Sequence, residues 1–307
     1  MGKLTDCALK IFTSSFLLFP ALLSAQEVDD VIFKLENNPP PFFPFSFGGS
    51  YITIEKAPVT SPELEGKELI FNQAEAVGVY THPLSYQSGL NFGAGWVSCE
   101  VNLQDNPHFN QTKFSYVNLL IGTYTAIFCD WFWKASVAAY FDTDEFSLID
   151  YTLYQGVAWG KYEFNEWLEL DFGFIVETGL SNTKVWPLIG FICNPFPRWE
   201  IHAVFPVDIC IDYTVTDCLA ASGSLRFLRS RHRLQQNEPS SQGVFNYQAT
   251  GVEFDLTYAP FVPLSITGYI GSTLGGDLKV GDRMDRHATH HKFQSSFYTG
   301  VTALLSF

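Results

Sequence analysis

The sequence predicts an all-β fold, a closed antiparallel transmembrane β-barrel, and three observations lead to this prediction. Apolar and polar residues alternate along many short segments of the chain. No window after the first 25 residues holds 18 uninterrupted apolar residues, so a helical membrane protein is excluded. The chain is 16% aromatic and only 16% charged, whereas soluble domains carry about 25% charged residues. Such a chain must place its apolar side chains in alternation, which is typical of a barrel in lipid.

The two ends of the chain predict export and three segments. Lys3 and Lys10 precede or begin an apolar run that ends near the small residues Ser24 and Ala25, as in a secretory signal. We therefore expect residues 1–25 to be a signal peptide. Residues 26–43 contain a run of prolines that favours an extended periplasmic leader, because proline does not fit inside a sheet. Residues 44–307 are expected to form the outer-membrane barrel.

The strand count follows from the alternating segments. The clearest covers residues 199–213, where odd positions are apolar and even positions include Asp208 and Asp212. The other candidates are 47–55, 69–80, 88–101, 113–127, 132–141, 150–162, 167–178, 185–193, 217–228, 251–258, 264–274 and 295–307. Together these are 13 segments, and bacterial barrels usually have an even number of strands. We therefore set aside the segment 47–55, the first along the chain, as an N-terminal extension. We expect about 12 strands, with 10 to 14 left open.

The charge balance and the cysteines limit the partners. A net charge of −14 argues against nucleic acid. Five cysteines follow the signal, and an odd number in an oxidising compartment leaves one thiol free or paired between chains in a disulfide-linked or homo-oligomeric contact. Cys210 and Cys218 flank an expected turn and could form a disulfide if a hairpin pairs them.

The last strand carries a candidate assembly signal. Phe307 and Leu305 share one face, and this arrangement resembles the C-terminal signal that the barrel-assembly machinery recognises. Thr302 stands where that signal usually has glycine, so the match is partial. We expect the machinery to be a partner of this chain.

A second resemblance comes from the region 170–230. Its residues include Trp186-Pro187-Leu188-Ile189-Gly190, Asn194-Pro195, Trp199, Phe205-Pro206 and Tyr213. This set resembles a poorly characterised family of bacterial, chlamydia-type outer-membrane β-barrel proteins. The resemblance implies a barrel in the cell outer membrane, in contact with its lipid, and it supplies no activity.

Seven acidic residues are candidates for a pore lining, because their positions place them on the inner face. They are Glu169, Asp171, Glu177, Asp208, Asp212, Glu253 and Asp255. Carboxylates in a lumen attract cations and repel anions, so we expect a narrow pore for small polar or cationic solutes. The alternative is a non-conducting barrel with an envelope-structural or surface-interaction role, its acids paired with Lys134, Lys161 or Arg226.

Three other groups of residues are weighed as sites. Arg229, Arg231, His232 and Arg233 could bind lipid phosphates, although a solvated periplasmic loop is the preferred interpretation. His287, His290 and His291 could bind a metal, and Asp282, Asp285 and His287 could serve a loop protease. Neither pattern fixes a geometry, and His202 faces inward, away from the place that a lipase needs. We expect no enzymatic activity, no cofactor and no metal.

Overall fold

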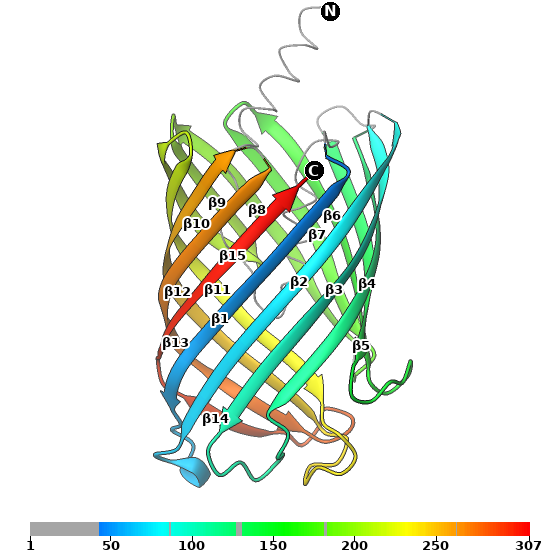
Figure 1. The fold of residues 1–307 in the computed structure, drawn as a ribbon, viewed down its shortest axis with the longest axis vertical. Helices are drawn as coiled ribbons and strands as arrows, with labels where there is room; N and C mark the ends of the chain where they lie inside the picture. The colour runs from blue at the N-terminus through cyan, green and yellow to red at the C-terminus, as the bar shows by residue number, and fades with distance from the viewer. Residues whose placement is uncertain (1–42, 86, 127–130, 181–182, 262) are drawn as a thin grey trace, which may run out of the picture.

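The computed structural model describes residues 43–85, 87–126, 131–180, 183–261 and 263–307. The expected signal peptide and all but residue 43 of the expected leader lie outside the described residues. The described chain confirms the predicted fold class, since its strands form one antiparallel sheet that closes into a barrel (Figure 1). Among these residues no helix is long and apolar enough to cross a membrane.

Within the described residues, fourteen strands form the closed wall and a fifteenth is added to it. Each strand pairs with the next along the chain from β1 to β13, and β15 closes the ring between β13 and β1. The strands are β1 (Phe45–Pro58), β2 (Glu68–Ser85), β3 (Ser88–Leu103), β4 (Lys113–Thr125), β5 (Trp131–Asp142), β6 (Thr152–Asn165), β7 (Leu168–Thr178), β8 (Lys184–Phe196), β9 (Trp199–Phe205), β10 (Asp208–Thr216), β11 (Leu219–Arg233), β12 (Val244–Phe261), β13 (Leu264–Gly281), β14 (Thr289–Phe293) and β15 (Phe297–Ser306).

The wall has two strands more than the 12 expected, within the range of 10 to 14 that was left open, and two features explain the difference. The segment set aside as an extension is β1, a full member of the wall that pairs with both β2 and β15. The segment 199–213 is two strands, because β9 ends at Phe205 and β10 begins at Asp208. Proline has no N–H for a ladder and here stands in the turn, at Pro206. The short β14 pairs with residues 276–280 of β13, beyond Ser272, where the pairing of β13 with β15 stops.

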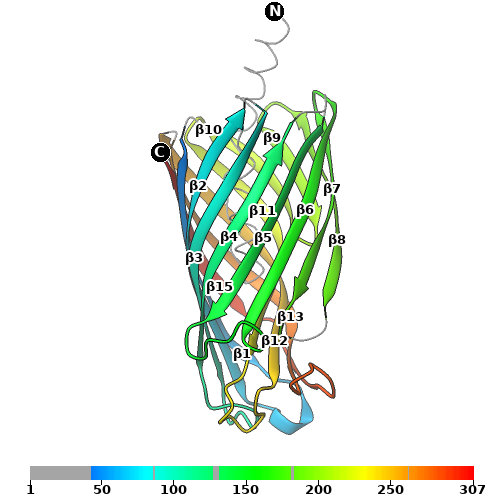
Figure 2. The same ribbon diagram turned by 90° about the vertical axis from the view of Figure 1, so that its right-hand side faces the viewer.

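The two ends of the barrel differ in their connections (Figures 1 and 2). At one end, which we call the turn end, connections such as 166–167, 197–198 and 217–218 are two residues long. The C-terminus lies at this end as well. At the other end, the loop end, the connections 59–67, 104–112, 143–151, 234–243 and 282–288 are longer. The short turn at residues 206–207 also points to the loop end but stops well before it.

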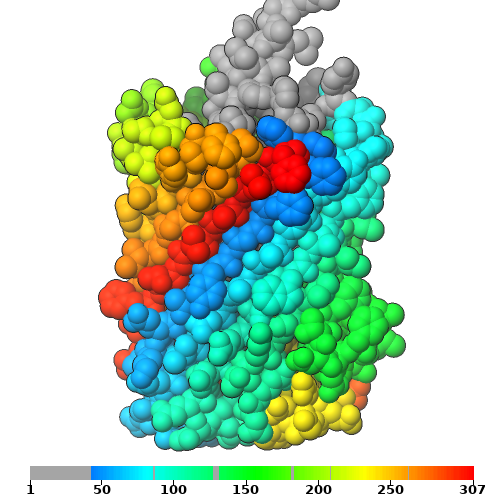
Figure 3. All heavy atoms as spheres, in the orientation of Figure 1, coloured from blue at the N-terminus to red at the C-terminus, as the bar shows by residue number. Residues whose placement is uncertain are grey.

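The outer surface is apolar, as the alternation predicts. Apolar side chains on the outer face are between 49% and 62% exposed at Ile121, Val137, Phe174, Ile211 and Phe254. Aromatic side chains gather at the turn end, where Trp131 stacks on Trp133 with centroids 5.2 Å apart and Trp199 contacts Tyr213 at 4.9 Å. The space-filling view shows β15 and β1 side by side in a continuous wall (Figure 3).

Candidate functional site

The interior of the barrel is the first candidate site, and its loop end is filled with apolar side chains. Strands β1 to β4 contribute Phe71 and Phe114 to this packing, and β12 contributes Phe245 and Tyr247. The rings of Phe71 and Tyr247 stack with centroids 4.1 Å apart, and those of Phe114 and Phe245 lie 4.5 Å apart. We call this set the apolar cluster. It joins opposite sides of the barrel and packs the interior at the loop end.

The remaining interior combines two smaller apolar groups, around Tyr116 and Trp159, with polar side chains that include most of the predicted acids. Glu169 forms an ion pair with Lys161 at 2.6 Å, and the indole Nε1 of Trp159 donates to Asp171 Oδ1 at 2.8 Å. Arg226 Nε donates to Glu253 Oε1 at 2.9 Å in a fully buried pair. These contacts show that acids and cations from neighbouring strands meet inside the barrel, as the alternation indicated.

The other predicted acids differ in their surroundings. Asp212 accepts hydrogen bonds from Ser222 Oγ and, at 3.3 Å, from Cys210 Sγ, while Asp255 accepts one from Ser224 Oγ at 2.6 Å. Asp208 begins β10, and its side chain lies outside what the structure describes. Glu177 lies nearer the loop end, paired with Arg231. The structure thus gathers the inner acids on β7 and β10 to β12, and their role in a pore stays a prediction.

Sequence reasoning left Glu200 out of the pore lining. Glu200 is buried and stands directly opposite Asp212 on the paired strands β9 and β10. Two carboxylates at opposite positions of a ladder repel each other unless a cation or a proton lies nearby. The signal was present in the sequence, because Glu200 shares the even-numbered face with His202, Asp208 and Asp212.

The basic run is the second candidate site, and the preferred interpretation of a solvated loop is wrong. Residues 229–233 continue β11 toward the loop end, and Arg231, His232 and Arg233 are buried. The guanidinium of Arg233 donates to the backbone oxygens of Leu180, Asp150, Gln242 and Arg283. These bonds hold several loops together at the loop end of the barrel.

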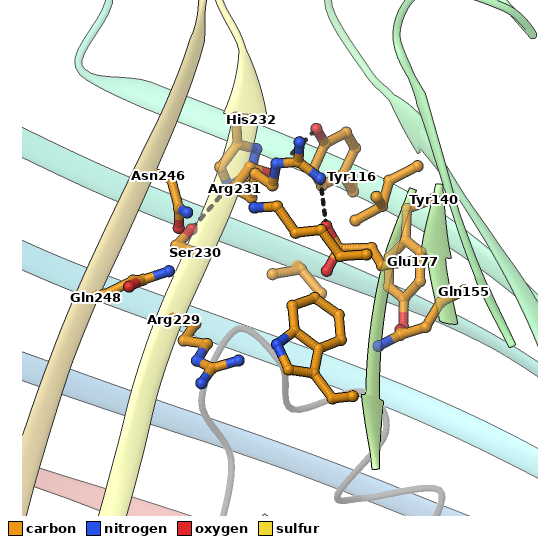
Figure 4. Close-up of a pocket in the computed structure, with 14 residues that line it drawn as sticks. Tyr116, Tyr140, Gln155, Glu177, Arg229, Ser230, Arg231, His232, Asn246 and Gln248 are labelled. Carbon is orange, nitrogen blue, oxygen red and sulfur yellow. Dashed lines mark hydrogen bonds and ion pairs between the residues drawn. The ribbon is translucent and has the colours of Figure 1, made fainter. Parts of the chain in front are cut away.

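A pocket adjoins this run on the side that faces β7 and β8 (Figure 4). It is partly open to solvent and has a cavity volume of about 50 Å³. Arg229 and Arg231 reach toward it from β11, and Glu177 from β7. Its lining is Val97, Tyr116, Tyr140, Leu153, Gln155, Glu177, Lys184, Trp186, Arg229, Ser230, Arg231, His232, Asn246 and Gln248.

The loop histidines do not converge. His287 Nδ1 lies 3.1 Å from Asp282, His290 Nδ1 lies 2.6 Å from Asp277, and His291 Nε2 lies 2.9 Å from His108 Nε2. Among the described residues, no group of three His, Cys, Asp or Glu side chains is arranged to hold a metal ion. Asp285 of the suggested protease contacts Arg231 and Lys279. His202 is buried, as its parity predicts.

The expected bridge between Cys210 and Cys218 is wrong, because the register of the hairpin differs from the one assumed. Cys210 pairs with Ser224 across β10 and β11, and Cys218 lies exposed in the turn. Within the described part of the chain, neither of them forms a disulfide, and neither do Cys99 and Cys193. Cys129 lies outside the described residues.

The candidate assembly signal occupies the seam where the barrel closes. Leu305 faces outward on β15, 39% exposed, and Phe307 follows the strand. The Phe307 ring stacks on Phe47 with centroids 5.6 Å apart, and its backbone N–H donates to the carbonyl oxygen of Phe45 at 2.8 Å. The terminal aromatic therefore joins the last strand to the first.

Comparison of the sequence with known proteins finds chlamydial relatives. An uncharacterised protein of Chlamydia pneumoniae is 29% identical over 285 residues, which cover 88% of this chain and 89% of the relative. Uncharacterised proteins of Chlamydia trachomatis serovar D and Chlamydia muridarum are 26% and 27% identical, over 97% of this chain and 100% of each relative. No protein-family model matches the chain. These relatives confirm the resemblance to a poorly characterised chlamydial family.

Solved structures of similar shape include outer-membrane proteins. An outer membrane channel from Pseudomonas putida F1 has a TM-score of 0.49 at 10% identity, over 86% of this chain and 96% of that one. The translocator domain of the autotransporter NalP from Neisseria meningitidis has a TM-score of 0.45 at 10% identity, over 92% of this chain and 94% of that one.

Proposed function

We propose that this chain, a relative of uncharacterised chlamydial proteins, is a barrel of the cell outer membrane that passes small polar or cationic solutes. The membrane location is supported by the apolar outer surface and the aromatic side chains that gather at the turn end. Short turns face the periplasm in outer-membrane barrels and longer loops face outward. On this basis the turn end is periplasmic and the loop end lies at the cell surface.

The observation that carries the pore proposal is the polar interior with unpartnered groups. Both side-chain polar atoms of Asn118, together with Glu200 Oε1 and Thr302 Oγ1, are buried without a hydrogen-bond partner among the described residues. A buried polar group without a partner costs about 1–3 kcal/mol, so groups of this kind on β4, β9 and β15 favour a hydrated interior. Water inside a barrel is the medium in which a small solute moves.

The preference for cations follows from the inner charges. Between the apolar cluster and the turn end, Glu200 lies opposite Asp212. In the same part of the interior, Asp171 accepts a hydrogen bond from Trp159, and Asp255 accepts one from Ser224. Among the described residues, the buried acids on β7 and β9 to β12 outnumber the inner cations Lys134, Lys161 and Arg226, of which Lys161 pairs with Glu169 and Arg226 with Glu253. An excess of carboxylates raises the local concentration of cations. We therefore expect a cation-selective conductance.

The apolar cluster favours the second candidate function, a non-conducting barrel with a role in envelope structure or surface interaction. Its aromatic rings pack across the interior at the loop end, and a straight path along the barrel axis would have to pass through them. In that case the inner acids serve to fill the barrel. A disulfide between chains through the exposed Cys218 is a related proposal.

Conductance in planar lipid bilayers tests the two functions. The refolded wild-type barrel should give small single-channel steps, with a reversal potential in a KCl gradient that indicates cation preference. Replacing Glu200 and Asp212 by Gln and Asn should reduce this preference because two inner carboxylates are lost. Glu55→Gln removes an exposed acid on β1 and is the matched control. A correctly folded wild-type barrel that never conducts would refute the pore and leave the non-conducting function.

A further inference from the structure

The barrel wall has a gap near the loop end, on the side of the β9–β10 hairpin. β9 ends at Phe205, opposite Ile189 of β8, and β10 begins at Asp208, opposite Arg226 of β11. Residues 184–188 of β8 therefore pair only with β7, and residues 227–233 of β11 pair only with β12, within the described chain. At about 3.3 Å per residue these two free edges are about 16 and 23 Å long.

The pocket borders this gap from inside the barrel. Its lining includes Lys184 and Trp186 from the free edge of β8, and Arg229 and Arg231 from the free edge of β11. In Figure 4 the side chain of Arg231 extends from β11 to Glu177 of β7, and Arg229 lies two residues away on the same strand. The rings of Phe205 and Phe227 meet edge to face at 5.9 Å where the gap begins. Side chains of β8 and β11 thus form the part of the pocket next to the gap, and the rest of its lining comes from β3 to β7 and β12.

The pocket has an excess of positive charge. Arg231 is satisfied, since it contacts Glu177 at 2.6 Å and Asp285 at 3.0 Å. Lys184 lies 3.8 Å from the same Asp285, a carboxylate that already serves two stronger contacts. Arg229 lies over the ring of Trp186 at 5.6 Å and has no hydrogen bond or ion pair to a carboxylate among the described residues. A half-buried guanidinium in this position is available to an anion.

Apolar side chains lie beside the pocket on the outer surface. Val185 is 61% exposed, Ile189 is 57% exposed and Phe205 is 48% exposed. They point away from the barrel interior, next to the same free edge of β8 that carries Lys184 and Trp186. A ligand with an anionic group and a hydrocarbon chain would place the first in the pocket and the second on these residues.

We propose that the gap between β8 and β11 binds the phosphate-bearing headgroup of an anionic outer-leaflet lipid, with Arg229 as the main anion-binding residue. The proposal rests on the membrane location proposed above, which places the gap at the headgroup level on the cell-surface side. The planar guanidinium binds phosphate through two parallel hydrogen bonds, while Lys184 adds charge and Trp186 packs against the guanidinium. The acyl chain lies along Val185, Ile189 and Phe205, and the lipid completes the wall where the hairpin stops.

A lipid fits these observations better than a soluble anion. A free phosphate would use Arg229 and Lys184 but would leave the adjacent apolar surface without a role. An acidic peptide that enters from the loop end would reach Arg229 but not the apolar side chains on the outer face of the wall. Arg229 lies at the edge of the gap beside these apolar side chains, so a molecule that already lies in the membrane reaches both.

Native mass spectrometry of the full barrel in an uncharged detergent tests the site. Dioleoyl phosphatidylglycerol, dioleoyl phosphatidylcholine and inorganic phosphate are titrated separately. We expect one phosphatidylglycerol to bind about tenfold more tightly than phosphatidylcholine. In phosphatidylcholine the choline cation balances the charge of the phosphate, so the charge-assisted hydrogen bond to Arg229 is lost. Arg229→Gln should remove this preference and Arg229→Lys should retain part of it. Lys113→Gln, which removes an exposed cation at the same end of the barrel, should leave the preference unchanged.

The outcomes separate this inference from the proposed function. Heat-modifiable gel mobility shows that each variant is folded. A folded wild type that binds both lipids equally, or an Arg229→Gln variant that keeps the preference, overturns the lipid site and leaves the pore proposal untouched. If inorganic phosphate competes as well as the lipid does, the ligand is a free anion and the lipid assignment is wrong. A barrel that does not insert into vesicles contradicts the membrane location itself.

Discussion

The loop-end and turn-end halves of the barrel interior are built from the same strands and filled by opposite chemistry. In β12 the inward residues Phe245 and Tyr247 belong to the apolar cluster, whereas Glu253 and Asp255, further along the same face, contact Arg226 and Ser224. An alternating pattern thus places a side chain inside the barrel without deciding what surrounds it. The loop-end half is packed like the core of a soluble protein, and the polar half depends on pairing and hydration.

This difference also applies to the wall. On the side of β1 to β4 the strands are long and fully paired, and their inner residues pack on the apolar cluster. On the opposite side the β9–β10 hairpin is short. There Arg229 of β11 lies over Trp186 of β8, and Arg231 of β11 pairs with Glu177 of β7. We expect the first side to contribute most of the stability and the second to be the place where ligands bind.

The largest expected effect is on the apolar cluster. Phe245→Ala should lower the free energy of unfolding by about 3–5 kcal/mol, because it removes a fully buried ring and leaves a cavity. Phe254→Ala on the outer face of the same strand, where the ring is 56% exposed, should cost clearly less. Urea unfolding of the refolded barrel in vesicles measures both. Equal losses would show that the cluster is not a packed core.

The next effect compares the two faces of the polar half. Ile211→Lys should lower the free energy of unfolding by about 2–4 kcal/mol if the side chain faces lipid near the midplane. Ser224→Lys should be tolerated far better, because Ser224 faces inward beside Asp255. The same unfolding titration applies, and similar losses for the two variants would contradict the assignment of the faces.

A smaller effect concerns the seam at the turn end. Deleting Phe307 removes its stacking on Phe47 and its two backbone hydrogen bonds with Phe45. An aromatic pair is worth about 0.5–1.5 kcal/mol, so the folded barrel should lose little stability. Its assembly in cells should fall more, if the terminal aromatic is the recognised signal. Phe261→Ser, an exposed aromatic near the same end, is the control, and a normal surface level of the deletion variant would refute the signal.

The smallest effect is a pH dependence of the loops. Burial lowers the pKa of His108, whose Nε2 lies 2.9 Å from His291 Nε2. Because the folded pKa lies below the ordinary value, the neutral ring stabilises the loop fully above about pH 6.5. This contribution is lost as the pH falls through the folded pKa. Hydrogen exchange of residues 104–112 should therefore quicken on acidification, and His108→Gln should weaken that response, whereas the exposed His287→Gln should not.

The segment 199–213 shows how far the alternation reaches. It placed Glu200, Asp212 and Ile211 on the correct faces, although the segment contains a turn. The hairpin pairs Val204 with Asp208, so even-numbered residues of both strands point inward and the parity is preserved. The single-strand interpretation failed because parity is the same for one long strand and for this hairpin. Only Pro206 indicated the break.

By itself, the sequence determined the fold class and the side of the wall on which most residues of the clear strands lie, because both depend on a local period of two residues. The tertiary structure decided the closure with β1 as a full member, the pairing of Cys210 with Ser224 and the division of the interior into two halves. It also decided that Arg229 and Arg231 lie beside a gap in the wall rather than in a solvated loop. Each of these depends on register between strands distant in the chain, which a local pattern does not contain.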